Sequence, residues 1–436
     1  MGVIDMRDYD SGNKLYELRK KHNLTQEELA YKLKISDKAI SKWENGSSKP
    51  SISNLKKLSE IYDMSIDKIL LKDKEPKKAQ VIKKIVITGG SDAGKTTAMN
   101  WIQNNFEKKG YKVVFIDSAA KEFINDGVLK GELKSTLKYQ SIVIDMQIAK
   151  EKIYEEAAKQ LPFEKILLVC KRGTVDAKAY MSNRDFEYML KERNLNEVEL
   201  RDAYDAVFHL VTSASGAEEY FLIDDPLRDN LIEEAKRIDD QIINAWTGHK
   251  YFRVIDNRST FQNKMKQLIK EISLFLGEEG PYETQRKFLI KKPDLDLLNK
   301  LHNCNKVKVI EIYLNEEKNS ISKLIQRGIN SNYTYSKITI NKDKNVETET
   351  RLTQDAYIEE LINIDTSKKI IIKDRYCLTV NSVYYEIDIY EHLEDKAICE
   401  VELTRSSELQ LPSIIEVIED ITNNEEYTSY YFASIK

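Results

Sequence analysis

The sequence predicts a multidomain protein in which an all-α bundle is followed by an α/β domain with a parallel sheet and then by an antiparallel β domain. Its 436 residues exceed the roughly 250–300 residues at which a single hydrophobic core stops growing. The local pattern also changes twice: capped helical segments extend to about residue 72, strands alternate with helices from residue 84, and period-two alternation begins near residue 282. With 41% hydrophobic residues and only 7 prolines, the chain has enough apolar material to fold.

Charge is distributed unevenly along the chain. Residues 13–80 hold 16 Lys and Arg against 10 Asp and Glu, whereas the whole chain has a net charge of −4. A basic N-terminal segment joined to an acidic remainder of the chain indicates a polyanionic partner for that segment. The longest apolar stretches are far shorter than the roughly 20 residues of a bilayer span, and the first ten residues lack the apolar core of a secretion signal. The four cysteines show no spacing typical of disulfides or zinc. We therefore expect a cytoplasmic protein with no membrane partner.

The segment from Lys14 to Leu71 has the pattern of five short helices. Thr25 and Glu28 form a capping box at the start of one helix, and Ser36 caps the next. Apolar residues at helical spacing then supply the shared core of a helix-turn-helix: Leu29, Leu33, Ile40 and Trp43.

The run LTQEELAYKLKISDKAISKWENGSSKPSISNLKKLSEIYDMS resembles the Cro/repressor type of DNA-binding domain, the xenobiotic-response-element (XRE) family. The resemblance implies that the helix starting at Ser36 lies in the major groove and that the protein binds DNA as a homodimer. The residues implied to contact DNA are Gln26, Asp37, Lys38, Ser41, Lys42 and Asn45. The alternative is a bundle that mediates protein contacts instead. This domain spans residues 1–72, and residues 73–83 form a Lys-rich linker.

A glycine-rich loop follows the predicted strand Lys84 to Thr88 and precedes a helical pattern. The sequence GGSDAGKTT is a Walker A motif, whose backbone amides surround phosphates while Lys95 contacts the β- and γ-phosphates and Thr96 offers a hydroxyl to Mg²⁺. This context predicts ATP or GTP binding by a parallel-sheet P-loop NTPase fold, with further strands at residues 112–117 and 165–170. The predicted nucleotide-binding residues are Gly89, Gly90, Ser91, Asp92, Ala93, Gly94, Lys95, Thr96 and Thr97.

Three segments beyond the loop carry a further resemblance: CKRGTVDAKAYM, ELRDAYDAVFHLVTSASGAEEYF and IINAWTGHKYFRVIDN. They resemble the ribosylnicotinamide-kinase-like P-loop ATPases, which include the animal protein named for defects in TRP and TRPL channel translocation. The resemblance covers residues 84–276 and implies catalytic roles for Arg172 and Asp176 near the phosphates and for Arg228 as a lid arginine.

This chain departs from that family at two carboxylates. Lys171 stands where relatives have Asp, and Ser118 stands where they have Glu, although Asp117 is adjacent. These departures remove metal- or water-positioning groups without changing the phosphate cradle. The alternative for Lys171 is that it faces solvent while Thr96 and Asp176 hold the metal.

From Tyr282 onward, alternation places charged residues on one face of each predicted strand, a pattern that a solvated sheet face would also give. However, residues 281–436 resemble the CYTH family of triphosphate tunnel enzymes. The resemblance is carried, in matching order, by six segments: YETQRKFLI, IQRG, YTYSKITI, ETETRL, YYEIDIY and ICEVELT. The resemblance implies an antiparallel β-barrel whose lumen binds a triphosphate compound through Lys287, Arg327, Lys337, Arg351, Lys373 and Arg375. It implies Mg²⁺ (or Mn²⁺) on Glu283, Glu400 and Glu402, with Glu347, Glu349 and Asp388 close by.

Gln285, Ile325 and Ile372 replace expected family residues in this domain, which puts turnover in question. The leading hypothesis is therefore a nucleotide-responsive DNA-binding regulator. The alternative is a metal-dependent enzyme, either a nucleoside-type kinase or NTPase at the P-loop or a triphosphatase in the barrel. A third reading is an interaction scaffold with two inactive ligand sites.

Overall fold

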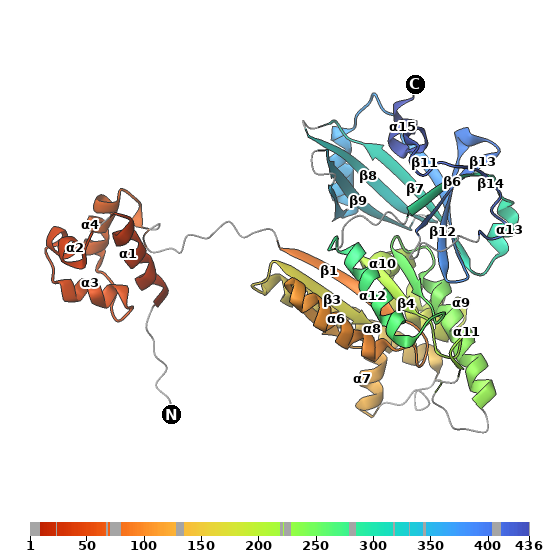
Figure 1. Cartoon of the computed structure of the whole chain (residues 1–436), viewed down its shortest axis with the longest axis horizontal. Coiled ribbons are helices and arrows are strands. Elements are labelled where there is room, and N and C mark those ends of the chain that lie inside the picture. The colour runs from red at the N-terminus through yellow and green to blue at the C-terminus, as the bar shows by residue number, and fades with distance from the viewer. Residues whose placement is uncertain are drawn as a thin grey trace. The chain divides into compact units, whose positions relative to one another are not determined.

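The chain divides into two compact units, Met1–Gln80 and Val81–Lys436, in the computed structural model (Figure 1). The structure describes residues 9–22, 24–66, 69, 80–127, 135–218, 221, 228–278, 285–316, 319–330, 332–342, 346–402 and 411–435. None of the described helices combines the length and apolarity that a membrane-spanning helix needs.

The first unit is a helical bundle of α1 (Tyr9–Lys21), α2 (Gln26–Leu33), α3 (Asp37–Glu44) and α4 (Ile52–Tyr62). The predicted capping box is confirmed, since the Thr25 hydroxyl accepts from the Glu28 amide at 3.1 Å and the Glu28 carboxylate accepts from the Thr25 amide at 2.7 Å. Ser36 caps α3 by accepting from the Ala39 amide. The predicted fifth helix falls where several residues lie outside the described ones.

Close contact between α1 and α3 holds this bundle together. A β-carbon on Gly12 would lie 2.5 Å from the carbonyl oxygen of Glu44, so only glycine lets α1 approach the end of α3 this closely. Arg19 on α1 then donates to both carboxylate oxygens of Glu44, at 2.6 and 2.8 Å. The predicted core residues, Leu29, Leu33, Ile40 and Trp43, are all buried.

The second unit begins with a five-stranded parallel sheet in the order β2-β3-β1-β4-β5, as predicted for an α/β domain. Its strands are β1 (Val81–Thr88), β2 (Tyr111–Ile116), β3 (Lys165–Lys171), β4 (Ala206–Leu210) and β5 (Phe252–Ile255). The helices are α6 (Lys95–Phe106), α7 (Ala119–Asn125), α8 (Thr136–Gln160), α9 (Asn183–Glu192), α10 (Glu197–Asp202), α11 (Arg228–Trp246) and α12 (Phe261–Phe275). Residues of α6 and α12 share one buried cluster with the sheet, and residues of α8, α9 and α11 share another.

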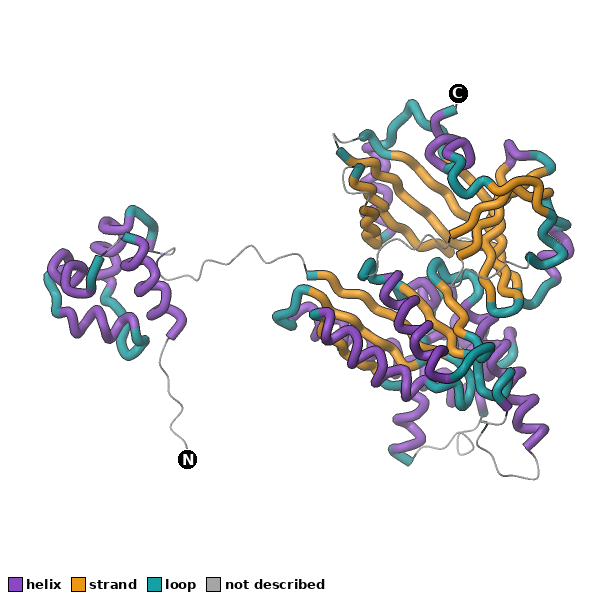
Figure 2. The backbone as a smooth tube through the Cα atoms, in the orientation of Figure 1, coloured by secondary structure: helices purple, strands orange, loops and turns teal. Residues whose placement is uncertain are grey.

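An antiparallel sheet of nine strands follows in the order β10-β9-β8-β7-β11-β12-β13-β6-β14, drawn as orange tubes in Figure 2. The strands are β6 (Gln285–Lys291), β7 (Cys304–Tyr313), β8 (Ser320–Ile329), β9 (Asn332–Asn341), β10 (Val346–Leu352), β11 (Ile371–Val380), β12 (Val383–Tyr390), β13 (Lys396–Glu402) and β14 (Val417–Asp420). Three helices accompany them: α13 (Leu295–Lys300), α14 (Gln354–Glu360) and α15 (Ser429–Ser434). Closure into a barrel stays a prediction, because β10 and β14 each pair with one neighbour within the described residues.

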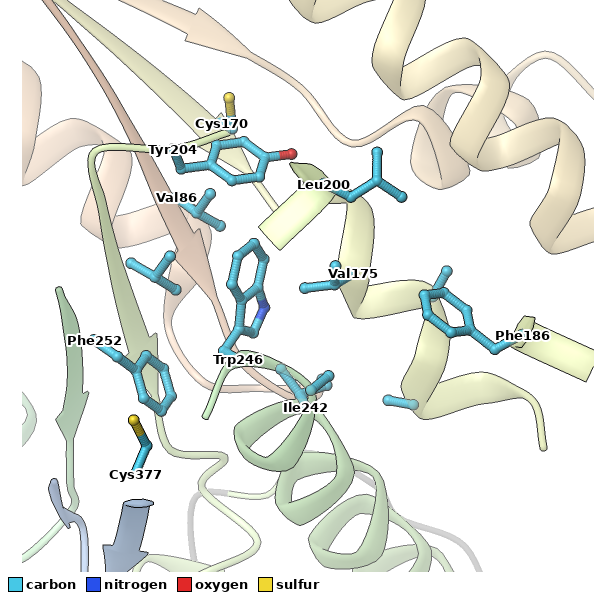
Figure 3. Close-up of a cluster of buried hydrophobic side chains, with 14 of the residues drawn as sticks. Val86, Cys170, Val175, Phe186, Leu200, Tyr204, Ile242, Trp246, Phe252 and Cys377 are labelled. Carbon is cyan, nitrogen blue, oxygen red and sulfur yellow. The ribbon is translucent and has the colours of Figure 1, made fainter. Parts of the chain in front are cut away.

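The two sheets of this unit share a core. Cys377 and Tyr384 of the antiparallel sheet belong to the same buried cluster as Trp246 and Phe252 of the α/β domain, and Figure 3 shows Phe252 beside Cys377. A buried ion pair reinforces the contact, with Arg327 Nη1 lying 2.9 Å from the Asp202 carboxylate. The parallel and antiparallel domains therefore fold against each other as one body.

Removing the carboxylate from this ion pair should destabilise the second unit. Asp202→Ala leaves the guanidiniums of Arg201 and Arg327 buried without their shared counter-ion, which typically costs about 3–5 kcal/mol. We expect urea unfolding of the full chain, followed by circular dichroism, to shift to lower urea. The control Asp145→Ala removes an exposed partner of Arg193 and should cost less than about 1 kcal/mol. Equal shifts in the two variants would contradict the assignment.

Candidate functional site

The glycine-rich loop connects β1 to α6, as the Walker A motif predicts. Gly89 and Gly94 have φ values of +138° and +88°, and a β-carbon at Gly89 would lie 2.1 Å from the Leu210 carbonyl oxygen. Lys95 Nζ donates to the carbonyl oxygens of Gly89, at 2.9 Å, and of Gly90. Desolvation lowers the pKa of Lys95 well below its ordinary value, and the nearby Arg172 lowers it further. An anion bound here would offset that penalty.

Asp239 of α11 anchors the loop from the other side. One carboxylate oxygen accepts the Gly90 amide at 2.6 Å and the other accepts the Thr212 amide at 3.2 Å. Burial alone would raise the pKa of Asp239, but His209 and these two amides hold it below its ordinary value. Sequence reasoning missed this residue, because nothing in the amphipathic pattern of the helix separates Asp239 from its neighbour Asp240.

Asp176 lies beside the loop, in a 3₁₀ turn that follows β3. Its two oxygens accept from the Thr88 hydroxyl at 2.7 Å and from Trp246 Nε1 at 2.6 Å, and Arg172 Nη1 lies 3.6 Å away. The structure thus brings Asp176 and Arg172 to the loop, whereas their catalytic roles stay predictions. The third residue of this group, Arg228, begins α11, but its side chain lies outside the described residues.

Lys171 directs its ammonium to Thr96, with Nζ donating to the Thr96 hydroxyl at 2.8 Å. In this structure Lys171 therefore contacts Thr96 instead of pointing to solvent, and a metal on Thr96 and Asp176 stays a prediction. Asp176 and Asp239 use both of their oxygens on protein donors, and no group of three or more His, Cys, Asp or Glu side chains suited to a metal occurs among the described residues. The described loop thus presents an ammonium at the Thr96 hydroxyl.

A second site lies on one face of the antiparallel sheet, around a cavity of about 1580 Å³. Residues directly opposite each other in antiparallel strands share a face, and the register places Arg375 opposite Asp388 and Lys287 opposite Glu400. The predicted residues that line this cavity are Lys287, Arg327, Glu347, Glu349, Arg351, Lys373, Arg375 and Glu400. The α/β domain contributes further lining residues, including Asp202, Asp205 and Lys250.

The charges of this face are paired with one another. Lys373 lies 2.8 Å from Asp388 and 3.2 Å from Glu311, and Arg375 lies 2.7 Å from the same Asp388. Lys287 lies 2.7 Å from Glu400. Cations and carboxylates therefore meet on one buried face, the arrangement that the resemblance implied.

The position of one predicted residue of this domain, Lys337, needs correction. Lys337 is not in the cavity: strand alternation turns it to the opposite face, where it donates to Glu360 of α14 at 2.9 Å. Arg327 lines the cavity but binds Asp202 and the Gly248 carbonyl oxygen. Glu283 and the side chain of Glu402 lie outside the described residues.

Lys323 and Glu311 were missed, and they pair at 2.7 Å on the cavity face. They lie on β8 and β7, which were not predicted as strands. The alternation in KVKVIEIY, within residues 306–313, could have indicated β7.

The helix-turn-helix unit presents polar residues on the outside of α3. Asp37, Lys38 and Lys42 are exposed, Ser41 is half-buried, and Ile40 and Trp43 face the core on the other side. Asn45 ends the helix and is exposed, with its side-chain oxygen accepting from the Ser47 amide. Gln26 of α2 differs, because its amide donates to Glu44 at 2.7 Å.

Comparison with known proteins agrees with this geometry. Residues 15–69 match the family described as helix-turn-helix, and residues 84–264 match the family described as AAA domain. The protein thus carries a helix-turn-helix domain of XRE type joined to a P-loop domain of AAA type.

Among curated proteins, the chain is similar to the HTH-type transcriptional activator BcrR of Enterococcus faecalis, with 47% identity over 57 residues, 13% of this chain and 28% of that protein. It is also similar to the HTH-type transcriptional regulator ImmR of Bacillus subtilis, with 40% identity over 67 residues, 15% of this chain and 53% of that protein. The chain thus covers about a quarter to a half of the length of these relatives. Among solved structures, the inorganic triphosphatase NE1496 matches 35% of this chain and 99% of its own, at 19% identity and a TM-score of 0.28.

The ion pairs of the cavity predict a specific pH dependence. Burial alone would raise the pKa of Glu311, but the ammonium groups of Lys373 and Lys323 lower it to about 2. A carboxylate with a depressed pKa stabilises the fold above its unfolded pKa of about 4.5, and this contribution is lost as the pH falls toward 2. Between pH 4.5 and 2, the unfolding free energy of Glu311→Gln should therefore decrease less than that of the native chain, by on the order of 3 kcal/mol.

Urea unfolding at a series of pH values measures this difference. Glu347→Gln, an exposed carboxylate on the same face, serves as the control and should keep the native profile. Parallel pH profiles for Glu311→Gln and the native chain would refute the role given to Glu311.

Proposed function

We propose that this protein is a nucleotide-responsive DNA-binding regulator. The helix-turn-helix unit binds DNA as a homodimer, the P-loop domain binds ATP or GTP, and the cavity of the antiparallel domain binds a triphosphate-containing small molecule. The observation that carries the proposal is the joining of a helix-turn-helix domain to a Walker A loop with Lys95 in place.

DNA binding is supported by the exposed face of α3. Lys38 and Lys42 lie one turn apart there, and neither forms an ion pair within the part of the chain that the structure describes. Phosphate contacts by such cations supply most of the affinity of a repressor-type helix for DNA. Curated relatives of this segment are named as transcriptional regulators, which is consistent with the same role here.

Nucleotide binding is supported by the cations at the glycine-rich loop, and triphosphate binding by the seven Lys and Arg side chains that line the cavity among nine carboxylates. The loop gathers Lys95, Lys171 and Arg172 around a site whose carboxylates already have partners. In the cavity, Glu400 and Glu386 are neighbours across β12 and β13, and paired carboxylates are a donor set that Mg²⁺ accepts. Mg²⁺ or Mn²⁺ would be held there by Glu400 together with Glu283 and Glu402.

Substitution on α3 tests DNA binding. Lys42→Ala should weaken binding of the full chain to a DNA selected by the native protein from a random pool by about tenfold, and lower the salt dependence by about one phosphate contact. Gel-shift titration over a range of salt concentrations measures both quantities. Lys56→Ala removes an exposed lysine from α4 and should leave both unchanged. Equal losses for the two variants would argue against α3 as the recognition helix.

Substitution in the loop tests nucleotide binding. Lys95→Ala should abolish measurable binding of ATP and GTP, because it removes the cation that contacts the phosphates. Isothermal titration calorimetry on the full chain gives the affinity, and Lys121→Ala, an exposed lysine of α7, provides a control with the same change of charge. Unchanged affinity in Lys95→Ala would remove the P-loop from the proposal. Phosphate release that disappears in this variant would instead favour an NTPase.

A further inference from the structure

The parallel sheet determines the position of Lys171. This residue is the last of β3 and lies opposite Ile87 of β1 in the parallel register, so its side chain emerges where β1 passes into the glycine-rich loop. From there Nζ reaches the Thr96 hydroxyl at 2.8 Å. A substitution that looked like the simple loss of a carboxylate in the sequence therefore adds a hydrogen-bonded cation to the loop.

The Thr96 hydroxyl is the group that a Walker A loop offers to a magnesium ion. In this protein the hydroxyl oxygen accepts a hydrogen bond from the Lys171 ammonium, so a positive charge already lies where the metal would approach. A divalent cation would have to displace Lys171 from this oxygen. Asp176 and Asp239 each accept hydrogen bonds from two protein donors, and Asp117 is an exposed residue near Lys171.

The loop also has more positive charge than Lys95 alone provides. Arg172 follows Lys171 in the chain, its amide bonded to the Ile87 carbonyl at 3.0 Å and its Nη1 3.6 Å from Asp176. Lys171, Arg172 and Lys95 lie close enough to one another to interact electrostatically. Three fixed cations can neutralise much of a triphosphate, which is the task that magnesium shares with a single lysine in an ordinary P-loop.

We propose that the Lys171 ammonium takes the place of magnesium in the P-loop, so that this domain binds a nucleoside triphosphate free of divalent metal. The inference rests on the proposed nucleotide binding and specifies its ligand as the metal-free nucleotide. Magnesium then competes with the loop for the nucleotide, because it binds the same phosphate oxygens in solution.

Calorimetry on the full chain, with ATP and with GTP as probes, tests this in two buffers, one containing EDTA and one containing excess MgCl₂. The native protein should bind at least as tightly in EDTA as in magnesium. Lys171→Asp should reverse that order: its affinity in EDTA should fall by about 10- to 100-fold, since a charge-assisted contact is lost and a negative charge is added, and magnesium should restore it.

Lys121→Asp is the matched control. Lys121 lies on α7, exposed, and acts on Lys171 only through its charge, so this variant changes the local charge equally without touching Thr96. It should keep the native preference for the metal-free nucleotide. The comparison of the native chain in the two buffers needs no variant, so it decides the question even if Lys171→Asp folds poorly.

Native binding that requires magnesium would overturn the role of Lys171 while leaving nucleotide binding intact. A Lys121→Asp variant that reverses its metal preference as strongly as Lys171→Asp would reduce the effect to general charge and also overturn it. Absence of nucleotide binding in both buffers would refute the proposed function itself.

Discussion

The carboxylate of Asp202 lies buried between the guanidiniums of Arg201 and Arg327, and this ion triad joins the parallel and antiparallel domains. Burial alone would raise the pKa of Asp202, but the two arginines hold it below its ordinary value. Because a buried ion without a partner costs several kcal/mol, the three residues constrain one another. Arg327 consequently serves the interface as well as the cavity, and residues of the α/β domain complete the cavity wall.

Helix α11 contacts both the glycine-rich loop and the antiparallel sheet. Asp239, in the middle of the helix, binds the Gly90 amide of the loop, and Trp246, at its end, binds Asp176. The next residue, Thr247, lies 3.1 Å from Thr379 of the antiparallel sheet. A β-carbon on Gly173 would lie 2.6 Å from the Trp246 ring, so this junction has no spare room. A ligand that displaced the loop would therefore also displace α11, which contacts the antiparallel sheet.

Much of this could be predicted from the sequence where the signal is local. The capping box of Thr25 and Glu28 and the Walker A glycines each determine their own short segment, and both lie where they were expected. Alternation along β10 likewise placed Glu349 and Arg351 on the cavity face. Lys337 was misplaced because a motif match ignores which face a residue takes in its strand, and the register turns it toward α14.

What could not be predicted depends on contacts between residues far apart in the chain. The partner of Lys171 is Thr96, 75 residues away, and the anchor of Gly90 is Asp239, 149 residues away. Neither pairing leaves a periodic or compositional mark, since each depends on the order of strands in the sheet. The interface role of Arg327 is hidden for the same reason, because its partner Asp202 lies in another domain.

The proposed function requires that DNA binding is coupled to the binding of a phosphate-bearing ligand. The most direct measurement is the affinity of the full chain for its selected DNA without ligand and with saturating ATP, GTP or tripolyphosphate. Coupling free energies of about 1–3 kcal/mol are typical of such linkage, so we predict a change in affinity of at least about fivefold with one of these ligands. Bound ligand with unchanged DNA affinity would contradict the account, leaving two binding activities that share a chain without influencing each other.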